Sequence, residues 1–235
     1  MDPAVDFAEI YAAHADEYDT LVRSEDAAGR LWRALDRLVG WTEANPVSTV
    51  CELGAGTGRL TVELVRRCRR VGAFDQSRAM LDVGRRRLAE HAGAKVAFGV
   101  AEHRAVPLAD RSVDVVIEGW AFAHYIDFEP DRWRDSLDAA LAECRRIVRD
   151  GGQIVLIETL GTGTTAATPP SGEHAALYAH LEDHHGFHRT EVRTDYGFAD
   201  RAQAERLVGG FFGEPMLERL TGPDGTSLPE VTGIW

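Results

Sequence analysis

The sequence predicts an α/β fold built on a doubly wound, mostly parallel sheet. From residue 46 onward, short apolar runs typical of buried strands alternate with longer amphipathic runs typical of helices. The first of these strands leads directly into a glycine-rich loop that opens a helix. With 235 residues, of which 44% are hydrophobic, the chain can bury one substantial core and add a small lid.

The expected elements follow one another regularly along the first two thirds of the chain. Helical periodicity runs from Asp6 to about Gly40, and Asn45-Pro46 ends it. Core strands are expected at 48–53, 70–74, 95–100, 113–118 and 153–158, and the helices between them at 60–68, 78–91 and 131–149.

The chain changes character after residue 160. We expect a Gly-, Thr- and Pro-rich loop at 161–172, a helix at 174–185, a strand at 190–198, a helix at 201–212 and a last, edge strand at 228–235. The chain stops at Trp235 within an apolar run, so we expect the sequence to be truncated there.

Charge and cysteine usage limit the classes of partner. A net charge of −12 argues against binding to nucleic acid, which depends on basic side chains that neutralise phosphates. No window approaches the roughly 18 uninterrupted apolar residues of a membrane span. The acidic N-terminus predicts no secretory leader, and Cys51, Cys68 and Cys144 lack metal-ligand spacing. We therefore expect a cytoplasmic protein with reduced thiols and with no membrane or nucleic-acid partner.

The glycine loop predicts a nucleotide-like cofactor. Gly54, Gly56 and Gly58 lie between a strand and a helix, where glycine allows a sharp turn and close approach of a ligand. The N-terminus of the following helix offers N–H donors to an anionic group. Asp75 ends the next strand, where a carboxylate can accept hydrogen bonds from both hydroxyls of a ribose.

A nicotinamide dinucleotide is the obvious competitor for this site, and the spacing disfavours it. The G-x-G-x-x-G pattern counted from Gly54 requires glycine at Arg59. Counted from Gly56, it requires glycine or alanine at Thr61. The observed pattern is instead E-x-G-x-G-x-G, beginning at Glu52.

This pattern resembles the first motif of the class I S-adenosylmethionine-dependent methyltransferases. The resemblance continues in order through residues 74–81, 107–116 and 146–152. It implies a Rossmann-like methyltransferase fold, with S-adenosyl-L-methionine as the cofactor and S-adenosyl-L-homocysteine as its product. It also implies an N-terminal helical lid at 1–45, a cofactor-binding core at 46–160, and a substrate-side insertion with C-terminal strands at 161–235.

The resemblance assigns cofactor-binding roles by position. The methionine moiety is expected at Glu52, Gly54, Gly56 and Gly58, and the ribose at Asp75. The adenine is expected at Gln76 or Met80, beside Ala101 and Glu102. Tyr18, Glu118 and Trp120 are expected to form further walls of the cofactor site. Tyr11 is a second candidate from the lid. Many relatives carry Asp where this chain has Val100, which we expect to be a buried strand end. Glu102, or the backbone at 101–102, then replaces that carboxylate.

The chemistry of methyl transfer directs attention to the end of the fourth strand. An in-line displacement needs alignment and exclusion of water, and it needs a general base only when the acceptor must lose a proton. His124 is the candidate base, because histidine titrates near neutrality. Tyr125 is the candidate for orienting the acceptor through its hydroxyl.

A histidine cluster in the later part of the chain raises the question of a metal. Its members are His174, His180, His184, His185 and His188. His180 and His184 share a face of an α-helix, but Leu181 stands where the H-E-x-x-H pattern requires glutamate. We therefore expect a solvated cap helix, with a substrate-facing role as the alternative, and no metal site.

The resulting functional expectation is methyl transfer to an oxygen or nitrogen of a small molecule. Heavy use of Ala, Gly and Arg, with Lys95 as the only lysine, favours a high-GC bacterial source, which concerns ancestry and not mechanism. The acceptor that we expect is a bacterial secondary metabolite. Two alternatives stay open: a methyltransferase that acts on RNA or protein, and a protein that binds S-adenosylmethionine without methylating. We expect a monomer or a homodimer.

Overall fold

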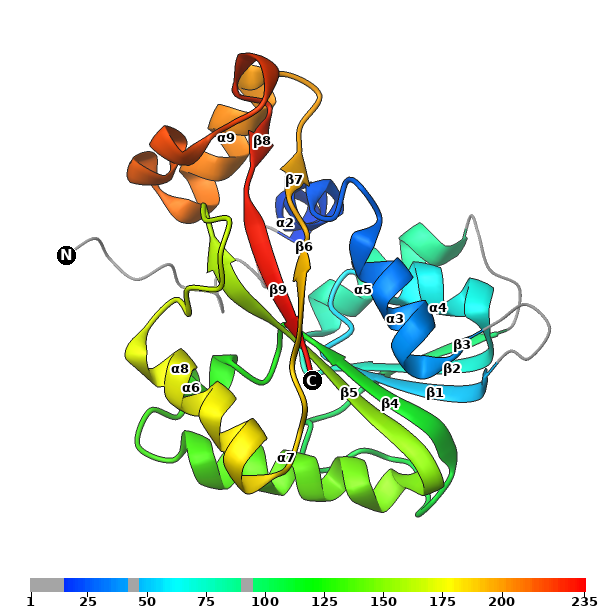
Figure 1. The fold of residues 1–235 in the computed structure, drawn as a ribbon. Coiled ribbons are helices and arrows are strands. Elements are labelled where there is room, and N and C mark those ends of the chain that lie inside the picture. The colour runs from blue at the N-terminus through cyan, green and yellow to red at the C-terminus, as the bar shows by residue number, and fades with distance from the viewer. Residues whose placement is uncertain (1–14, 42–46, 90–94) are drawn as a thin grey trace.

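The computed structural model describes residues 15–41, 47–89 and 95–235. Their central feature is a seven-stranded sheet in the order β3-β2-β1-β4-β5-β9-β6, with helices on both faces (Figure 1). The first five strands of the chain run parallel and the last two pairings are antiparallel. The predicted α/β architecture is confirmed.

Five parallel strands and their crossover helices form the core. The strands are β1 (Val47–Leu53), β2 (Cys68–Asp75), β3 (Val96–Val100), β4 (Val113–Gly119) and β5 (Val148–Thr162), and the helices are α4 (Thr61–Arg67), α5 (Arg78–Ala89), α6 (His124–Phe128) and α7 (Trp133–Ile147). β1 lies between β2 and β4, so the chain winds in opposite directions on its two sides. The loops that follow β1 and β4 therefore run away from each other. This place, the topological switch point of the sheet, is where ligands bind in open α/β sheets.

The prediction of an edge strand at 228–235 is wrong. β9 (Glu230–Ile234) lies between β5 and β6 (Thr190–Arg193) and pairs antiparallel with both. Every residue of β9 is buried, which an edge strand does not require. β6 is the edge instead and carries the charged residues Glu191 and Arg193, which discourage further strand pairing.

Pairing with β9 also changes two neighbouring predictions. β5 extends to Thr162, which pairs with Glu230, so the loop expected at 161–172 begins two residues later than predicted. The expected strand at 190–198 is divided into β6 and the short β7 (Tyr196–Gly197), which pairs with β8 (Ser227–Leu228). Beside that second sheet lie α9 (Arg201–Phe212), η2 (Glu214–Arg219) and η3 (Pro223–Gly225), above the main sheet in Figure 1.

The two described N-terminal helices have different surroundings. α2 (Ala15–Ser24) lies near α5 and reaches the mouth of the switch point. α3 (Arg30–Val39) packs on the sheet, where its Leu31 and Leu35 share a buried cluster with Ile234 of β9.

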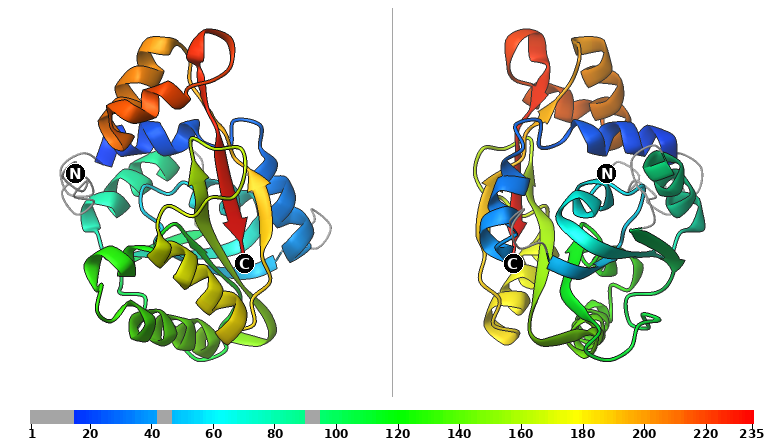
Figure 2. Two further views of the ribbon diagram at one scale, coloured as in Figure 1. Left: turned by 60° about the vertical axis from the view of Figure 1, so that its left-hand side comes forward. Right: turned by 90° about the vertical axis from the view of Figure 1, so that its right-hand side faces the viewer.

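The insertion after β5 covers the opposite face (Figure 2). α8 (Gly172–Ala179) continues into η1 (His180–His184), a single π turn. Leu177 and Leu181 share a buried cluster with Trp133 of α7, whose indole Nε1 donates to Glu173 at 3.0 Å. In the part of the chain that the structure describes, no helix has the length and apolarity to cross a membrane.

Candidate functional site

A cavity of about 430 Å³ lies at the switch point of the sheet. Its walls come from α2, the β1–α4 loop, the end of β2, the loop after β3, the end of β4, and α6. This volume falls within the roughly 300–1,000 Å³ typical of sites for small molecules and cofactors. The cavity brings together eleven of the fourteen predicted site residues that the structure describes: Tyr18, Glu52, Gly54, Gly56, Asp75, Gln76, Met80, Glu102, Trp120, His124 and Tyr125.

Each of the three glycines in the loop is required for a different structural reason. Gly54 has φ of 68°, and a Cβ there would lie 2.3 Å from the Cβ of Ala121. Gly56 has φ of 50° and exposes its backbone to the cavity. Gly58 does not line the cavity; a Cβ there would lie 3.2 Å from Leu88 of α5, so this glycine permits close packing of the loop on that helix.

Asp75 connects the glycine loop to the end of β2. Its Oδ2 accepts from the backbone N–H of Gly56 at 2.8 Å, and its Oδ1 accepts from that of Ser77 at 2.7 Å. Burial raises the pKa of Asp75, and these two hydrogen bonds oppose the rise. Each carboxylate oxygen has capacity for another donor, and the side chain lines the cavity beside Gln76 and Met80.

Arg59 and Trp120 form a wall that sequence reasoning missed. The guanidinium carbon of Arg59 lies 3.6 Å from the centroid of the Trp120 ring, and its Nη1 lies 3.0 Å from Oε2 of the buried Glu25. Burial acts to lower the pKa of Arg59, but the Glu25 carboxylate outweighs it and the pKa is raised. Trp120 has φ of 53°, a left-handed conformation that bulky residues rarely adopt. The only sequence signal for Arg59 is its position directly after the third glycine.

Three residues that line the cavity also carry buried polar atoms without a partner in the ranges that the structure describes. In the described part of the chain, three buried polar atoms on cavity-lining residues have no hydrogen-bond partner: Oγ1 of Thr57, Nη2 of Arg59 and Nε1 of Trp120. Buried polar groups in proteins almost always have partners. Two of these groups are obligate donors, so the surface is suited to an acceptor such as a carboxylate.

Two predicted acidic residues hold the loops in place from within the protein. Glu52 is 1% exposed at the floor of the cavity and accepts from Thr61 Oγ1 at 2.6 Å, and burial raises its pKa to about 8. Glu118 does not line the cavity, because its Oε1 accepts the backbone N–H groups of Ala121 and Phe122 at 2.6 and 3.0 Å. Burial, together with the neighbouring carboxyl group of Glu158, raises the pKa of Glu118.

The expected adenine side differs in part from the prediction. Val100 is 51% exposed and not a buried strand end, because it ends β3, the outermost strand on that side of the sheet. Ala101 does not line the cavity; its N–H donates to the backbone carbonyl of Asp75 at 3.1 Å. Glu102 does line it, paired with Arg104, whose Nη2 lies 3.0 Å from Oε1 of Glu129.

The far side of the cavity is aromatic and carries two histidines. His124 stacks on Phe128 with 5.5 Å between the ring centroids, and burial lowers the pKa of His124 to about 4. The hydroxyl of Tyr125 lies 3.3 Å from Nδ1 of His103, and burial raises the pKa of Tyr125. Burial also lowers the pKa of His103 to about 4. His103 was missed from the sequence, where its only signal is its place beside Glu102 in the loop after the third strand.

The N-terminal helices contribute one predicted residue to the cavity. Tyr18 of α2 lines it together with Val22. The Tyr18 ring meets Phe211 of α9 edge-on at 6.2 Å, so α9 supports α2 from behind. Tyr11, the other candidate from this region, lies outside the described residues.

Comparison with known proteins identifies a methyltransferase domain in this part of the chain. Residues 50–152 match the family described as methyltransferase domain. The malonyl-[acyl-carrier protein] O-methyltransferase of Serratia marcescens is 32% identical over 153 residues, which are 65% of this chain and 54% of that protein. The demethylmenaquinone methyltransferase of Thermobifida fusca is 35% identical over 156 residues, 65% of this chain and 61% of that protein. The chain thus spans less than two thirds of the length of either relative.

The fold comparison points the same way. A crystal structure of an S-adenosylmethionine-dependent methyltransferase from Aquifex aeolicus superposes with a TM-score of 0.51 at 14% identity, covering 86% of this chain and 88% of that one. The matched residues 50–152 contain the glycine loop, Asp75 and His124. Residues 50–152 therefore form a methyltransferase domain of the class I, S-adenosylmethionine-dependent type, and the fold of the chain is the Rossmann-like fold of such proteins.

Proposed function

We propose that this chain transfers a methyl group from S-adenosylmethionine to an oxygen or nitrogen of a small molecule. The observation that carries the proposal is the 2.8 Å hydrogen bond from Gly56 N–H to Asp75 Oδ2 in the cavity that also contains His124. This bond fixes the loop expected to hold the methionine moiety against the carboxylate expected to hold the ribose. The candidate base then lies across the same cavity.

The residues present fit S-adenosylmethionine on their own chemistry. The left-handed Gly54 and Gly56 bring backbone, without side chains, to the cavity surface. Arg59 Nη2 and Trp120 Nε1 are buried donors without a partner among the described residues, and a carboxylate such as that of the methionine moiety accepts from such groups. Asp75 has acceptor capacity left for ribose hydroxyls.

Methyl transfer in this cavity depends on alignment. When bound, S-adenosylmethionine supplies an electrophilic methyl group on a sulfonium. Asp75 would hold the ribose, and the glycine loop together with Arg59 and Trp120 would hold the methionine moiety. Trp120, Tyr125 and Phe128 exclude water from the space between donor and acceptor. Alignment of this kind can supply a large part of the rate enhancement.

His124 is proposed to accept a proton from the acceptor. Because burial lowers its pKa to about 4, its imidazole is neutral at physiological pH, the protonation state in which one ring nitrogen is an acceptor. The Tyr125 hydroxyl can donate to His103 Nδ1 at 3.3 Å, or turn to orient an acceptor oxygen. A hydroxyl or ammonium acceptor has the removable proton that this arrangement needs.

Three observations support a small acceptor over nucleic acid. The net charge is −12, and the acceptor side of the cavity is lined by aromatic rings and by the Arg104–Glu129 ion pair. The two relatives named above act, by their names, on malonyl-[acyl-carrier protein] and on demethylmenaquinone. A secondary metabolite of bacterial origin remains our proposed acceptor.

Calorimetry tests the cofactor, and labelled methyl groups test the acceptor. The 235-residue protein is titrated with S-adenosylhomocysteine and separately with NADH; we expect binding of the first alone, and binding of NADH alone would overturn the proposal. The protein is then incubated with methyl-labelled S-adenosylmethionine and pools of small hydroxylated or amino compounds, RNA, or protein. Label in the small-molecule pool is expected. Label only in RNA or protein would overturn the acceptor class, and binding without any transfer would make the chain a non-methylating binder.

A further inference from the structure

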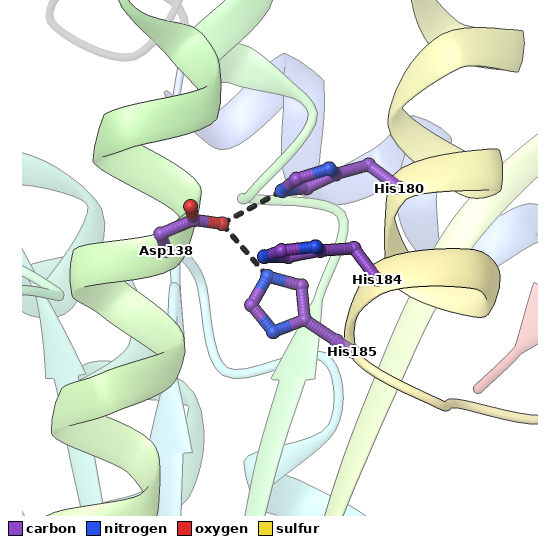
Figure 3. A group of neighbouring side chains, drawn as sticks. All are labelled: Asp138, His180, His184 and His185. Carbon is purple, nitrogen blue, oxygen red and sulfur yellow. Dashed lines mark hydrogen bonds and ion pairs between the residues drawn. The ribbon is translucent and has the colours of Figure 1, made fainter.

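A second group of chemically active side chains lies between α7 and the insertion that follows β5. Asp138 of α7 and His180, His184 and His185 each offer one ligand atom, and these atoms all lie within 4.8 Å of one another. Figure 3 shows the carboxylate and the three imidazole rings pointing toward one another from the two elements. None of the four residues lines the cavity described above.

The contacts within this cluster converge on one oxygen atom. Nε2 of His180 and Nε2 of His185 each lie 2.7 Å from Oδ1 of Asp138. The His184 ring stacks on His180 with 4.7 Å between centroids and meets His185 edge-on at 4.9 Å. The rings therefore present nitrogen atoms to a common small volume.

The π turn explains how three histidines so close in sequence share one side of the chain. His185 N–H donates to the carbonyl of His180 at 3.2 Å, the i to i+5 bond of a π turn. Such a turn holds more residues than an α-helical turn, so positions 180, 184 and 185 come to one side. An α-helix would bring together only His180 and His184. Isolated π turns are rare and occur frequently at functional sites.

We propose that Asp138, His180, His184 and His185 form a binding site for a divalent transition-metal ion, with Zn²⁺ as the expected ion. Imidazole and carboxylate are ligands that Zn²⁺ accepts in tetrahedral sites, with metal–ligand distances of about 2.0–2.2 Å. Mg²⁺ and Ca²⁺ prefer sets of oxygen ligands and do not suit three nitrogens. Four protein ligands leave no open position, so the site is structural and joins η1 to α7.

Binding requires only local movement. Ligand atoms around a tetrahedral zinc ion lie about 3.3–3.5 Å apart. The 2.7 Å distances from Asp138 Oδ1 to the two Nε2 atoms of His180 and His185 must therefore lengthen. The two ligand atoms that lie farthest apart, up to 4.8 Å, must approach each other by more than about an ångström. His184 is exposed and the Asp138 side chain is 41% exposed, so both can turn. The backbone of η1 and α7 can stay where it is.

Arg145 competes with the metal. Its Nη2 lies 3.1 Å from His185 Nδ1, and because a guanidinium can only donate, Nδ1 accepts and the ring proton resides on Nε2. A metal bond at Nε2 needs the lone pair there, so that proton moves through solvent to Nδ1. The exposed Arg145 then turns away. Removal of Arg145 is therefore expected to tighten metal binding.

The test uses tag-free full-length protein stripped of metal with a chelator. Co²⁺ is titrated while its visible absorption is followed, and Zn²⁺ and Mg²⁺ are added as competitors. We expect one Zn²⁺ per chain, displacement of Co²⁺ by Zn²⁺ and not by Mg²⁺, and a thermal midpoint that rises with Zn²⁺. Asp138→Ala, His180→Ala and His185→Ala should each raise the Kd by at least about tenfold. His188→Ala, an exposed histidine of the same segment outside the cluster, is the matched control and should bind as the unaltered protein does.

Two results with the unaltered protein and the ligand variants would overturn the proposal. One is the absence of stoichiometric Zn²⁺ binding, and the other is Zn²⁺ binding that the Asp138 and His185 substitutions leave unchanged. If an alanine variant does not fold, Arg145→Ala still tests the site, because this variant keeps all four ligands. It should lower the Kd for Zn²⁺ severalfold. An unchanged or higher Kd counts against the proposed site. Binding of S-adenosylhomocysteine should be the same with and without Zn²⁺. The metal site can thus fail or succeed independently of the proposed methyl transfer.

Discussion

The guanidinium of Arg59 lies flat against the indole of Trp120, 3.6 Å from the ring centroid, and so joins the β1–α4 loop to the end of β4. Glu25, in the turn between α2 and α3, holds the other side of the guanidinium at 3.0 Å. The N-terminal helices, the glycine loop and the fourth strand therefore meet at one partly buried cation.

Replacement of Arg59 should weaken binding of S-adenosylhomocysteine. Hydrogen bonds to charged groups contribute about 1.5–3 kcal/mol, so Arg59→Ala should raise the Kd about ten- to hundredfold by calorimetry. Arg66→Ala, on the exposed side of α4, is the matched control and should bind normally. Because Glu25 loses its partner, thermal unfolding is measured alongside. A folded Arg59→Ala protein with unchanged affinity would remove Arg59 from the cofactor site.

Asp75 is expected to be as important for affinity, through the ribose of the ligand. Asp75→Ala removes the acceptor for the ribose and for the Gly56 and Ser77 N–H groups, so the Kd for S-adenosylhomocysteine should rise at least about tenfold. Asp82→Ala removes a carboxylate of α5 that pairs with Arg85 and should leave the affinity unchanged. Equal affinities in the two variants would contradict the assignment.

His124→Ala should slow methyl transfer by about 10²–10⁴-fold when the acceptor has a proton to lose, while cofactor affinity stays the same. Because burial lowers the pKa of His124 to about 4, the base is already deprotonated at pH 5 and above. The rate should therefore fall only as the pH approaches about 4 and should show no His124-dependent step near 6.5. A step near 6.5 that disappears in His124→Ala would show that this histidine titrates normally.

Glu52 should make the folded protein less stable as the pH rises. Burial raises its folded pKa from the ordinary 4.5 to about 8, so the folded state binds more protons than the unfolded state between these values. Stability must fall with rising pH across that window. Each unit of raised pKa corresponds to about 1.4 kcal/mol, so Glu52→Gln should gain at least that much relative to the unaltered protein between pH 5 and pH 8. Urea denaturation of both proteins at the two pH values measures it; a pH-independent difference would contradict the raised pKa.

Gly54→Ala should destabilise the protein more than Gly151→Ala does. Both glycines have left-handed backbones, with φ of 68° and 75°, so each substitution carries roughly 1–2 kcal/mol of backbone strain. A Cβ at Gly54 would also lie 2.3 Å from Ala121 Cβ, whereas one at Gly151 would meet nothing within 4 Å. Overpacking should add about 1–3 kcal/mol at Gly54 alone, measured as the free energy of unfolding. Equal losses would mean that the loop relaxes around the new methyl group.

The predictions from sequence that succeeded rest on local patterns. Strand and helix periodicity located the core elements, and the spacing of Gly54, Gly56 and Asp75 placed them in one cavity because the ends of adjacent parallel strands meet at one edge of the sheet. Exposure of Val100 could not be read from its own apolar neighbours, since it depends on β3 having a partner on one side only.

The features that the sequence could not predict depend on distant pairings. Nothing near Arg59 indicates that Trp120 will adopt a left-handed backbone and present its ring to the guanidinium. His185 joins His180 only because one turn is a π turn, and Asp138 reaches both from a different helix. An α-helical wheel drawn from the sequence shows neither relationship.

The central position of β9 has a consequence for how the chain is made. Synthesis delivers the five parallel strands first, and they can pair as they emerge. β6 is delivered next, but among the described strands of the main sheet it pairs with β9 alone, so it must wait for residues 230–234. During that interval the outer edge of β5 presents unpaired N–H and C=O groups, as an open strand edge that can capture other nascent chains.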